Sequence, residues 1–220
     1  MIRYCLHDTG GSRSIPADDP IRAGASADGA EIALVIGREA GRHGAGLAPS
    51  DYRAVLVELD GECLGVHGGE DFGREGGNRL GFARFRLGDA PPSRLVEIVV
   101  QPATTEDARV AATALFEAAG LSVAVCRDTP GRIVDRLIRP YFNQALQALD
   151  EGLAEPDVLD RTLRLGLGYP RGPVELLRDS GLHHHGAVTA ALHAALGQAP
   201  YHPARRAQVA ASRARRAPGS

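Results

Sequence analysis

The stretch LVEIVVQPATTEDARVAATALFEAAGLSVAVCRDTPGRIVDRLIRPYFNQALQALDEG, residues 95–152, contains the change of hydrophobic period that decides the fold. Residues 94–102 are rich in β-branched side chains and predict a strand. A helix is predicted over 104–120, with Thr104 as its N-cap, and another strand over 121–128. A strand, a helix and a strand of these lengths make one βαβ unit, which indicates a parallel sheet.

The residues before this stretch predict further strands separated by glycine-rich loops. Residues 1–30 are polar and broken by Gly, Pro and Ser, so we expect them to be irregular. The first glycine-rich loop contains Gly37 and Gly41, and no amphipathic helix is expected after it. The additional strands are predicted over 31–37, 52–61 and 79–87.

The residues after 128 have a helical period. Pro140 is expected to kink the first of these helices, which has a wide apolar face. Shorter helices are predicted over 155–166, 172–181 and 186–197. The predicted fold class is therefore α/β followed by all-α: a parallel sheet, then a helical bundle, with a junction near residue 128.

The composition of the 220 residues excludes several classes of function. Hydrophobic residues make up 44% and charged residues 24%, as in ordinary globular proteins. No apolar run has the length that a bilayer requires, and the first residues lack the pattern of a secretory signal, so we expect a cytoplasmic protein. The three cysteines form no Cys-x-x-Cys pair, which indicates neither a disulfide framework nor a metal site.

The charged residues balance almost evenly, and every cation except histidine is arginine. The net charge is −2, so nothing in it demands a nucleic acid partner. The absence of lysine excludes a Schiff base and a phosphate-binding P-loop lysine. Residues 204–220 form a basic tail with five arginines. Such a tail can bind phosphate groups, including that of CoA, but a frayed, solvated helix is the favoured interpretation.

Glu97 is a single carboxylate inside an otherwise apolar strand. A charge buried on such a strand requires a partner. One alternative is an ion pair with an arginine, such as Arg84 or Arg94, and the other is a catalytic role beside a histidine.

Two motifs make residues 94–203 resemble the 3-hydroxyacyl-CoA dehydrogenase family. They are DTPGRIV (128–134) and LGLGYPRGPVELL (165–177), which occur in the order that this family has. The resemblance implies the last strands of a dinucleotide-binding domain and a C-terminal helical domain. It also implies NAD as cofactor, an acyl-CoA of fatty-acid metabolism as substrate, and a dimer.

The resemblance also implies roles for individual residues. In this family a histidine takes the hydroxyl proton, a glutamate orients the histidine, and an asparagine holds the substrate oxygen. Glu97 matches the glutamate, and Asp135 stands where the asparagine belongs. The histidine position is taken by Ala83 or by Phe85, depending on where the gap is placed. Neither side chain accepts a proton.

The cofactor-binding residues implied by the resemblance are Gly37 and Gly41. Their spacing departs from the Gly-x-Gly-x-x-Gly turn that holds a dinucleotide pyrophosphate, which weakens the expectation of NAD. His43 and His67 lie in the glycine-rich segments and could replace the missing base, although exposed loop histidines are the favoured interpretation. The run His183–His185 is expected to be a solvent-exposed helix start.

Together these inferences predict two domains, a C-terminal tail and a function. Residues 1–128 form a degenerate Rossmann-like domain, 129–203 the helical domain, and 204–220 the tail. We expect a dehydrogenase-related protein that lacks its catalytic base and acts as an acyl-CoA-binding or dimerising partner, as a homodimer or beside a complete dehydrogenase subunit. The alternative is an active NAD-dependent enzyme with an altered site.

Overall fold

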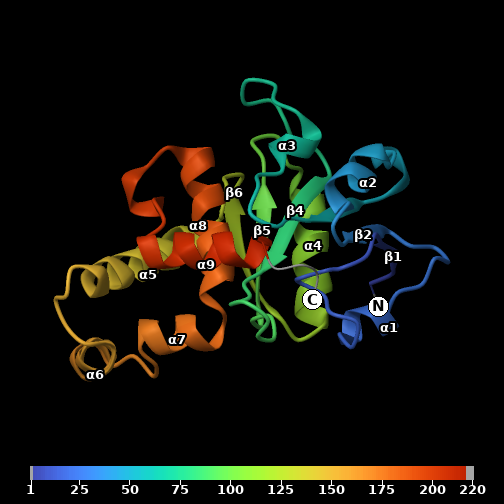
Figure 1. Cartoon of the computed structure of the whole chain (residues 1–220). Helices are drawn as coiled ribbons and strands as arrows, with labels where there is room; N and C mark the ends of the chain where they lie inside the picture. Colours follow the sequence, from blue (N-terminus) through green and yellow to red (C-terminus); the bar gives the residue numbers. More distant parts are fainter. Residues whose placement is uncertain (1, 217–220) are drawn as a thin grey trace. The chain divides into compact units, whose positions relative to one another are not determined.

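The computed structural model describes residues 2–216, which divide into two compact units. Within the described residues, the first unit comprises 2–86 and Pro92–Ile133, and the second comprises Leu87–Pro91 and 134–216. The first contains a six-stranded sheet and the second contains helices (Figure 1). The fold is thus a reduced Rossmann-like α/β unit followed by a helical bundle.

The strands of the sheet follow one another in the order of the chain, β1-β2-β3-β4-β5-β6. All neighbours are parallel except β4 and β5, which are antiparallel, so the sheet is mixed rather than wholly parallel. The short connection between these two strands explains the reversal, because a parallel return needs a longer crossover. The strands are β1 (Tyr4–Asp8), β2 (Ile32–Ile36), β3 (Ala54–Glu58), β4 (Arg79–Arg84), β5 (Leu95–Val100) and β6 (Ser122–Arg127).

Two expectations for the first half of the chain are wrong. Residues 1–30 are not wholly irregular, because β1 and a short helix, α1 (Pro20–Ala23), lie there. The edge strand is only partly buried and has a neighbour on one side alone, so its sequence lacks the continuous apolar run of β2 and β3. A helix does follow β2, namely α2 (Ala40–Gly46), whose three glycines hid it from a propensity argument.

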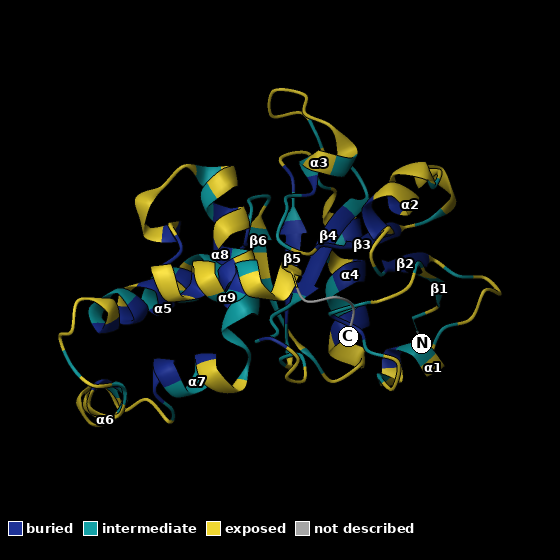
Figure 2. Cartoon of the chain, viewed as in Figure 1, coloured by how far each residue is buried: buried dark blue, intermediate teal, exposed yellow. Residues whose placement is uncertain are grey.

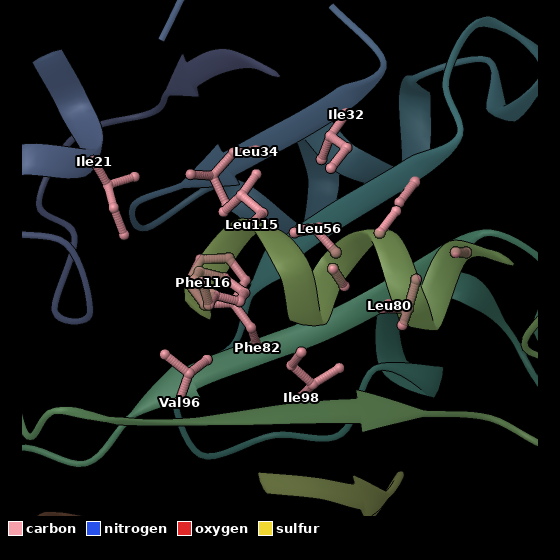
Figure 3. Packing of buried hydrophobic residues seen from close by; sticks show 14 of the residues in the cluster. Ile21, Ile32, Leu34, Leu56, Leu80, Phe82, Val96, Ile98, Leu115 and Phe116 are labelled. Carbon is pink, nitrogen blue, oxygen red and sulfur yellow. The ribbon is translucent and has the colours of Figure 1, made fainter. Parts of the chain in front are cut away.

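Both faces of the central strands, β2 to β5, are buried (Figure 2). One face packs against α4 (Glu106–Ala118), where Phe82 and Phe116 have ring centroids 5.2 Å apart (Figure 3). The other face carries Val35, Val55 and their neighbours, with α2 and α3 (Gly65–Gly68) after β2 and β3. Burial on both faces explains why these strands are apolar throughout.

The N-cap of α4 is Thr105 and not Thr104 as expected. The Thr105 hydroxyl accepts the amide N–H of Ala108, whereas the hydroxyl of Thr104 accepts that of Gln101 at 2.8 Å. Thr105→Ala should lower the free energy of unfolding by about 1 kcal/mol, because one amide at the start of α4 loses its acceptor. Urea denaturation measures this loss, with Thr105→Ser as the matched control that keeps the cap. A loss as large for Thr105→Ser as for Thr105→Ala would contradict it.

The second unit is built on α5 (Val134–Asp150), which runs through Pro140 as one helix. Proline has no N–H, so it cannot donate to the carbonyl of Arg136 one turn earlier. The buried hydroxyl of Tyr201 donates to that carbonyl instead, at 3.1 Å. The other elements of this unit are α6 (Pro156–Leu167), α7 (Pro173–Asp179), α8 (Leu182–Leu196), α9 (Arg205–Arg216) and the 3-10 turn η2 (Ala199–Tyr201). The 3-10 turn η1 (Pro49–Asp51) belongs to the first unit.

The basic tail forms the helix α9, as expected, but one side of this helix is packed against α8 and is not solvated. Ala207 and Ala211 of α9 are buried, and Gly186 of α8 lies so close to the carbonyl of Ala207 that a Cβ would be 2.5 Å from it. Arg206 pairs with Asp150 at 2.6 Å. The contact between α9 and α8 is made by alanines rather than by large apolar residues, so the sequence pattern is typical of a solvated helix. The arginines of α9 are exposed. Residues 217–220 of the predicted tail lie outside the described residues.

Among the described residues, no helix has both the length and the apolar character that crossing a bilayer requires.

Candidate functional site

Glu97 lies in the middle of β5, and its side chain is 3% exposed. The antiparallel register pairs it directly with Ala83 of β4. Residues opposite each other in such a pair project to the same face of the sheet. A residue at position 83 is therefore the cross-strand neighbour of Glu97, and this chain has a methyl group there.

The ionic partner of Glu97 is Arg132. Their charged groups approach to 3.5 Å, both side chains are almost fully buried, and Glu97 also accepts the amide N–H of Ile133 at 2.8 Å. An arginine partner was one of the two expectations, but the arginines named were wrong. Arg84 pairs with Asp19 at 2.6 Å, and Arg94 donates to the carbonyl of Gly120.

Arg132 reaches Glu97 because its backbone adopts an uncommon conformation. Its φ is +50°, directly after Gly131 at +74°, so the chain turns sharply between β6 and α5. Its Nη2 donates to the carbonyl of Asp60 at 2.5 Å, whereas Nε and Nη1 are buried without a hydrogen-bond partner. The Arg132–Glu97 contact is therefore a charge contact without aligned hydrogen bonds. Sequence reasoning missed it because a left-handed arginine is unusual.

Asp135 lies in the first turn of α5, in the second unit. Its carboxylate accepts from Nε of Arg139 at 2.7 Å, an i,i+4 pair in which Arg139 is 3% exposed. The carboxylate charge is thus balanced within one turn of its own helix. Asp135 offers acceptors only, whereas an asparagine could also donate a hydrogen bond to a substrate oxygen.

A buried polar chain continues from this pair through the second unit. Nη1 of Arg139 approaches Nδ1 of His185 at 3.5 Å, and Nε2 of His185 lies 3.0 Å from Oδ1 of Asn143. Because Nδ2 of Asn143 donates to Thr189 and to the carbonyl of Pro200, its oxygen must accept, so His185 carries its proton on Nε2. Burial, together with the charge of Arg139, lowers the pKa of His185 to about 3. His185 is therefore buried, contrary to the expectation of a solvent-exposed histidine run.

The lowered pKa of His185 predicts a pH dependence of stability. In the unfolded state His185 has an ordinary pKa of about 6.5. Below that pH the unfolded state therefore binds a proton that the folded state does not bind, which favours unfolding. The contribution of neutral His185 to the free energy of unfolding is complete above about pH 6.5. It decreases by about 1.4 kcal/mol per pH unit as the pH falls toward 3. The free energy of unfolding of His185→Gln should lack this component of the slope between pH 6.5 and 4.5. Equal slopes in the two proteins would contradict the assignment.

Gly37 lies at the turn between β2 and α2, where a cofactor turn would lie, and Gly41 lies in the first turn of α2. Gly37 has φ +99° and lies against Gly10, and the ring of His67 packs directly over Gly41. However, the amide of Gly37 already donates to the Glu58 carboxylate at 2.7 Å. Glu58 also accepts the amides of Arg13 and Ser14, at 2.9 and 2.6 Å. This carboxylate ends β3, another lone acid in an apolar strand, and that signal in the sequence was overlooked.

A cavity of about 640 Å³ lies beside this turn. Its lining carries both signs of charge, from Arg13, Arg38, Arg42, Glu39, Glu58, Asp60 and Glu62. A dinucleotide pyrophosphate needs free amides and positive charge at such a turn. Here a buried carboxylate holds the amide of Gly37, so these residues do not fit a pyrophosphate at that position.

The two histidines considered as replacement bases lie in short helices rather than open loops. His67 in α3 lines the cavity, with Nε2 3.2 Å from the Glu62 carboxylate. His43 in α2 contacts Nδ1 of His7 at 3.0 Å. In the part of the chain that the structure describes, no group of three or more His, Cys, Asp and Glu residues is arranged to hold a metal ion.

Comparison with known proteins finds similarity to 3-hydroxyacyl-CoA dehydrogenases. Residues 131–220 match the family model described as 3-hydroxyacyl-CoA dehydrogenase, C-terminal domain. The "Probable 3-hydroxybutyryl-CoA dehydrogenase" of Bacillus subtilis is 32% identical over 117 residues, which are 53% of this chain and 41% of that protein. The "3-hydroxyadipyl-CoA dehydrogenase" of Escherichia coli is 39% identical over 109 residues, 50% of this chain and 23% of that protein.

The structural comparison extends the similarity to most of the chain. The crystal structure of 3-hydroxybutyryl-CoA dehydrogenase from Escherichia coli K12 superposes with a TM-score of 0.71 at 26% identity, over 87% of this chain and 42% of that one. The (S)-3-hydroxybutyryl-CoA dehydrogenase PaaH1 from Ralstonia eutropha gives 0.71 at 21% identity, over 86% and 70%, which shows the same fold. This chain spans less than half the length of the curated relatives described above. The motifs, the fold and these matches together make this chain similar to the 3-hydroxyacyl-CoA dehydrogenases, with residues 131–220 matching the C-terminal domain of that family.

Proposed function

We propose that this protein does not itself transfer hydride and acts as an acyl-CoA-binding or dimerising partner within acyl-CoA metabolism. The observation that carries the proposal is the surroundings of Glu97. Its cross-strand neighbour is Ala83 and its ionic partner is Arg132. The acid that would orient a histidine is instead balanced by a buried guanidinium.

The chemistry of the family explains why these substitutions matter. Oxidation of a hydroxyl group requires a base within hydrogen-bond reach, which contributes on the order of 10²–10⁴ to the rate. Neither alanine nor an arginine cation can accept that proton. The Asp135 carboxylate would also oppose negative charge developing on a substrate oxygen. Because Glu58 holds the amide of Gly37, the turn that would bind NAD is unsuited to it.

The second unit has a surface suited to an acyl chain or to another subunit. An apolar groove of about 490 Å³ lies between α5 and α6, lined by residues that include Tyr141, Ala148, Leu153 and Leu163. Beyond it, Leu165 is 81% exposed. Exposed apolar surface of this kind is typical of binding sites.

Two measurements on the purified chain test the proposal. We expect no turnover of acetoacetyl-CoA with NADH, and heat of binding for acetoacetyl-CoA that NAD does not change. Ala148→Trp should fill the groove and reduce acyl-CoA binding or dimerisation, whereas Val209→Trp, on the exposed face of α9, is the matched control. Turnover well above background would overturn the proposal, as would the absence of both acyl-CoA binding and self-association.

One observation favours the alternative, an active enzyme with an altered site. His67 and Glu62 form a base-and-acid pair on the wall of the larger cavity. If this pair supplied the missing base, wild-type turnover would be measurable and His67→Gln would abolish it, while Ala83→Ser would leave it unchanged.

A further inference from the structure

Three side chains of the first unit form a hydrogen-bonded chain that the proposed function does not use. Cys5 and His7 are two residues apart on β1, so they project to the same face of the strand. The Cys5 sulfur lies 3.4 Å from Nε2 of His7, and Nδ1 of His7 lies 3.0 Å from Nε2 of His43. The two imidazole rings are tilted against each other, with centroids 4.9 Å apart.

The Cys5 thiol has two acceptors within reach, Nε2 of His7 and the carbonyl of Ile32. When the Cys5 thiol donates to Nε2 of His7, the His7 proton lies on Nδ1 and is donated to His43. Burial and the neighbouring His43 both lower the pKa of His7, which favours its neutral form near pH 7. A neutral imidazole beside a thiol is the arrangement that activates cysteine nucleophiles, and His43 holds the ring in position.

The thiol also faces space and a hydroxyl group. Cys5 and His7 line a cavity of about 460 Å³, together with Gly29, Ala30 and Tyr52. The Tyr52 hydroxyl lies on the same cavity, and its pKa is raised mainly by its interaction with Cys5. The Cys5 thiol is also within 3.6 Å of the carbonyl of Ile32, to which it donates when it does not donate to His7. The cavity is large enough for a short acyl group and part of its carrier.

We propose that Cys5 is a nucleophile that takes an acyl group from a thioester, with His7 as its base and His43 as a positioning residue. This inference rests on the proposed function for its choice of acyl donor, an acyl-CoA. Its reactive group is a thiol on β1 that the family chemistry around Glu97 does not involve.

The exchange balances without a further reactant. The Cys5 proton moves to Nε2 of His7, and the thiolate attacks the carbonyl carbon of the thioester. The new carbon–sulfur bond forms, the bond to the CoA sulfur breaks, and the departing CoA thiolate takes the proton back from His7. The products are an acylated Cys5 and free CoA thiol, with no change of oxidation state.

The test is to incubate the full chain with acetoacetyl-CoA at pH 7.5 and locate the acyl group by mass spectrometry of peptides. We expect the label on Cys5, with Cys63 and Cys126 as internal controls. Burial raises the pKa of Cys126 to about 11, so that thiol should be the least reactive. His7→Asn should slow labelling on the order of 10²-fold. His43→Gln should move the pH profile of labelling, to which Cys5, His7, Tyr52 and the nearby Asp51 contribute.

Controls separate this inference from the proposed function. Iodoacetamide should alkylate Cys5 of wild type faster than Cys63, and this difference should vanish in His7→Asn, whose folding is checked by circular dichroism. Calorimetry on Cys5→Ser reports acyl-CoA binding without the thiol. If binding persists but wild-type Cys5 is not labelled, or is labelled equally fast in His7→Asn, this inference fails alone. If binding is absent in both proteins, the acyl-CoA part of the proposed function fails.

Discussion

Arg132→Met should destabilise the protein by about 3–5 kcal/mol, because it removes the cation that balances a buried carboxylate. Glu97 is 3% exposed on its side chain and Arg132 is 4% exposed, so water cannot replace the lost partner. Methionine keeps much of the arginine volume, so the loss reports charge rather than packing. Urea denaturation followed by circular dichroism measures it.

The matched control is the double variant Glu97→Gln with Arg132→Met. Replacing both charges of a buried pair is often nearly neutral, so this protein should recover most of the lost stability. If Arg132→Met alone costs less than about 1 kcal/mol, or if the double variant is as unstable as the single one, the pair does not balance Glu97 as described.

Glu58→Ala should be comparably damaging, by roughly 3 kcal/mol or more, for a different physical reason. The carboxylate of Glu58 accepts three backbone amides, from Arg13, Ser14 and Gly37. Each buried donor left without an acceptor costs about 1–3 kcal/mol. The loss should appear as lower stability and as faster amide exchange at these three positions.

The control for Glu58 is Glu62→Ala on the same cavity wall, whose carboxylate contacts His67 and the amide of Asp60. That variant should lose less than about 1 kcal/mol, since its side chain is partly exposed. Addition of inorganic phosphate should restore part of the stability of Glu58→Ala and none of wild type, because the freed amides can bind an anion. Equal phosphate effects in the two proteins would show that Glu58 does not occupy an anion site.

The order of a sheet followed by helices could be predicted from the sequence, because the period of the hydrophobic residues becomes helical after residue 128. It did not allow β1 or α2 to be predicted. The first is a half-buried edge strand, and the second contains glycines that close packing against Val57 and His67 requires. Local secondary-structure propensity reflects neither the edge position of β1 nor the close packing of the glycines in α2.

The candidate site was predictable only in part. Glu97 was identifiable as a lone charge in a strand, and the same reasoning would have identified Glu58. The partners were not, because strand register and a left-handed φ at Arg132 are set by tertiary structure. The register also decides which residue faces Glu97: Ala83 does, whereas Phe85 follows the end of β4. The roles of Asp135, Gly37 and Gly41 stay predictions.

The hydroxyl of Tyr201, which fills the gap that Pro140 leaves in α5, ties two positions 61 residues apart in the chain. A relative that has replaced the proline regains its amide, and phenylalanine then becomes acceptable at the tyrosine position. A relative that keeps the proline should keep the tyrosine. The two sites are thus expected to change together in evolution, and Pro140→Ala should rescue Tyr201→Phe in the laboratory.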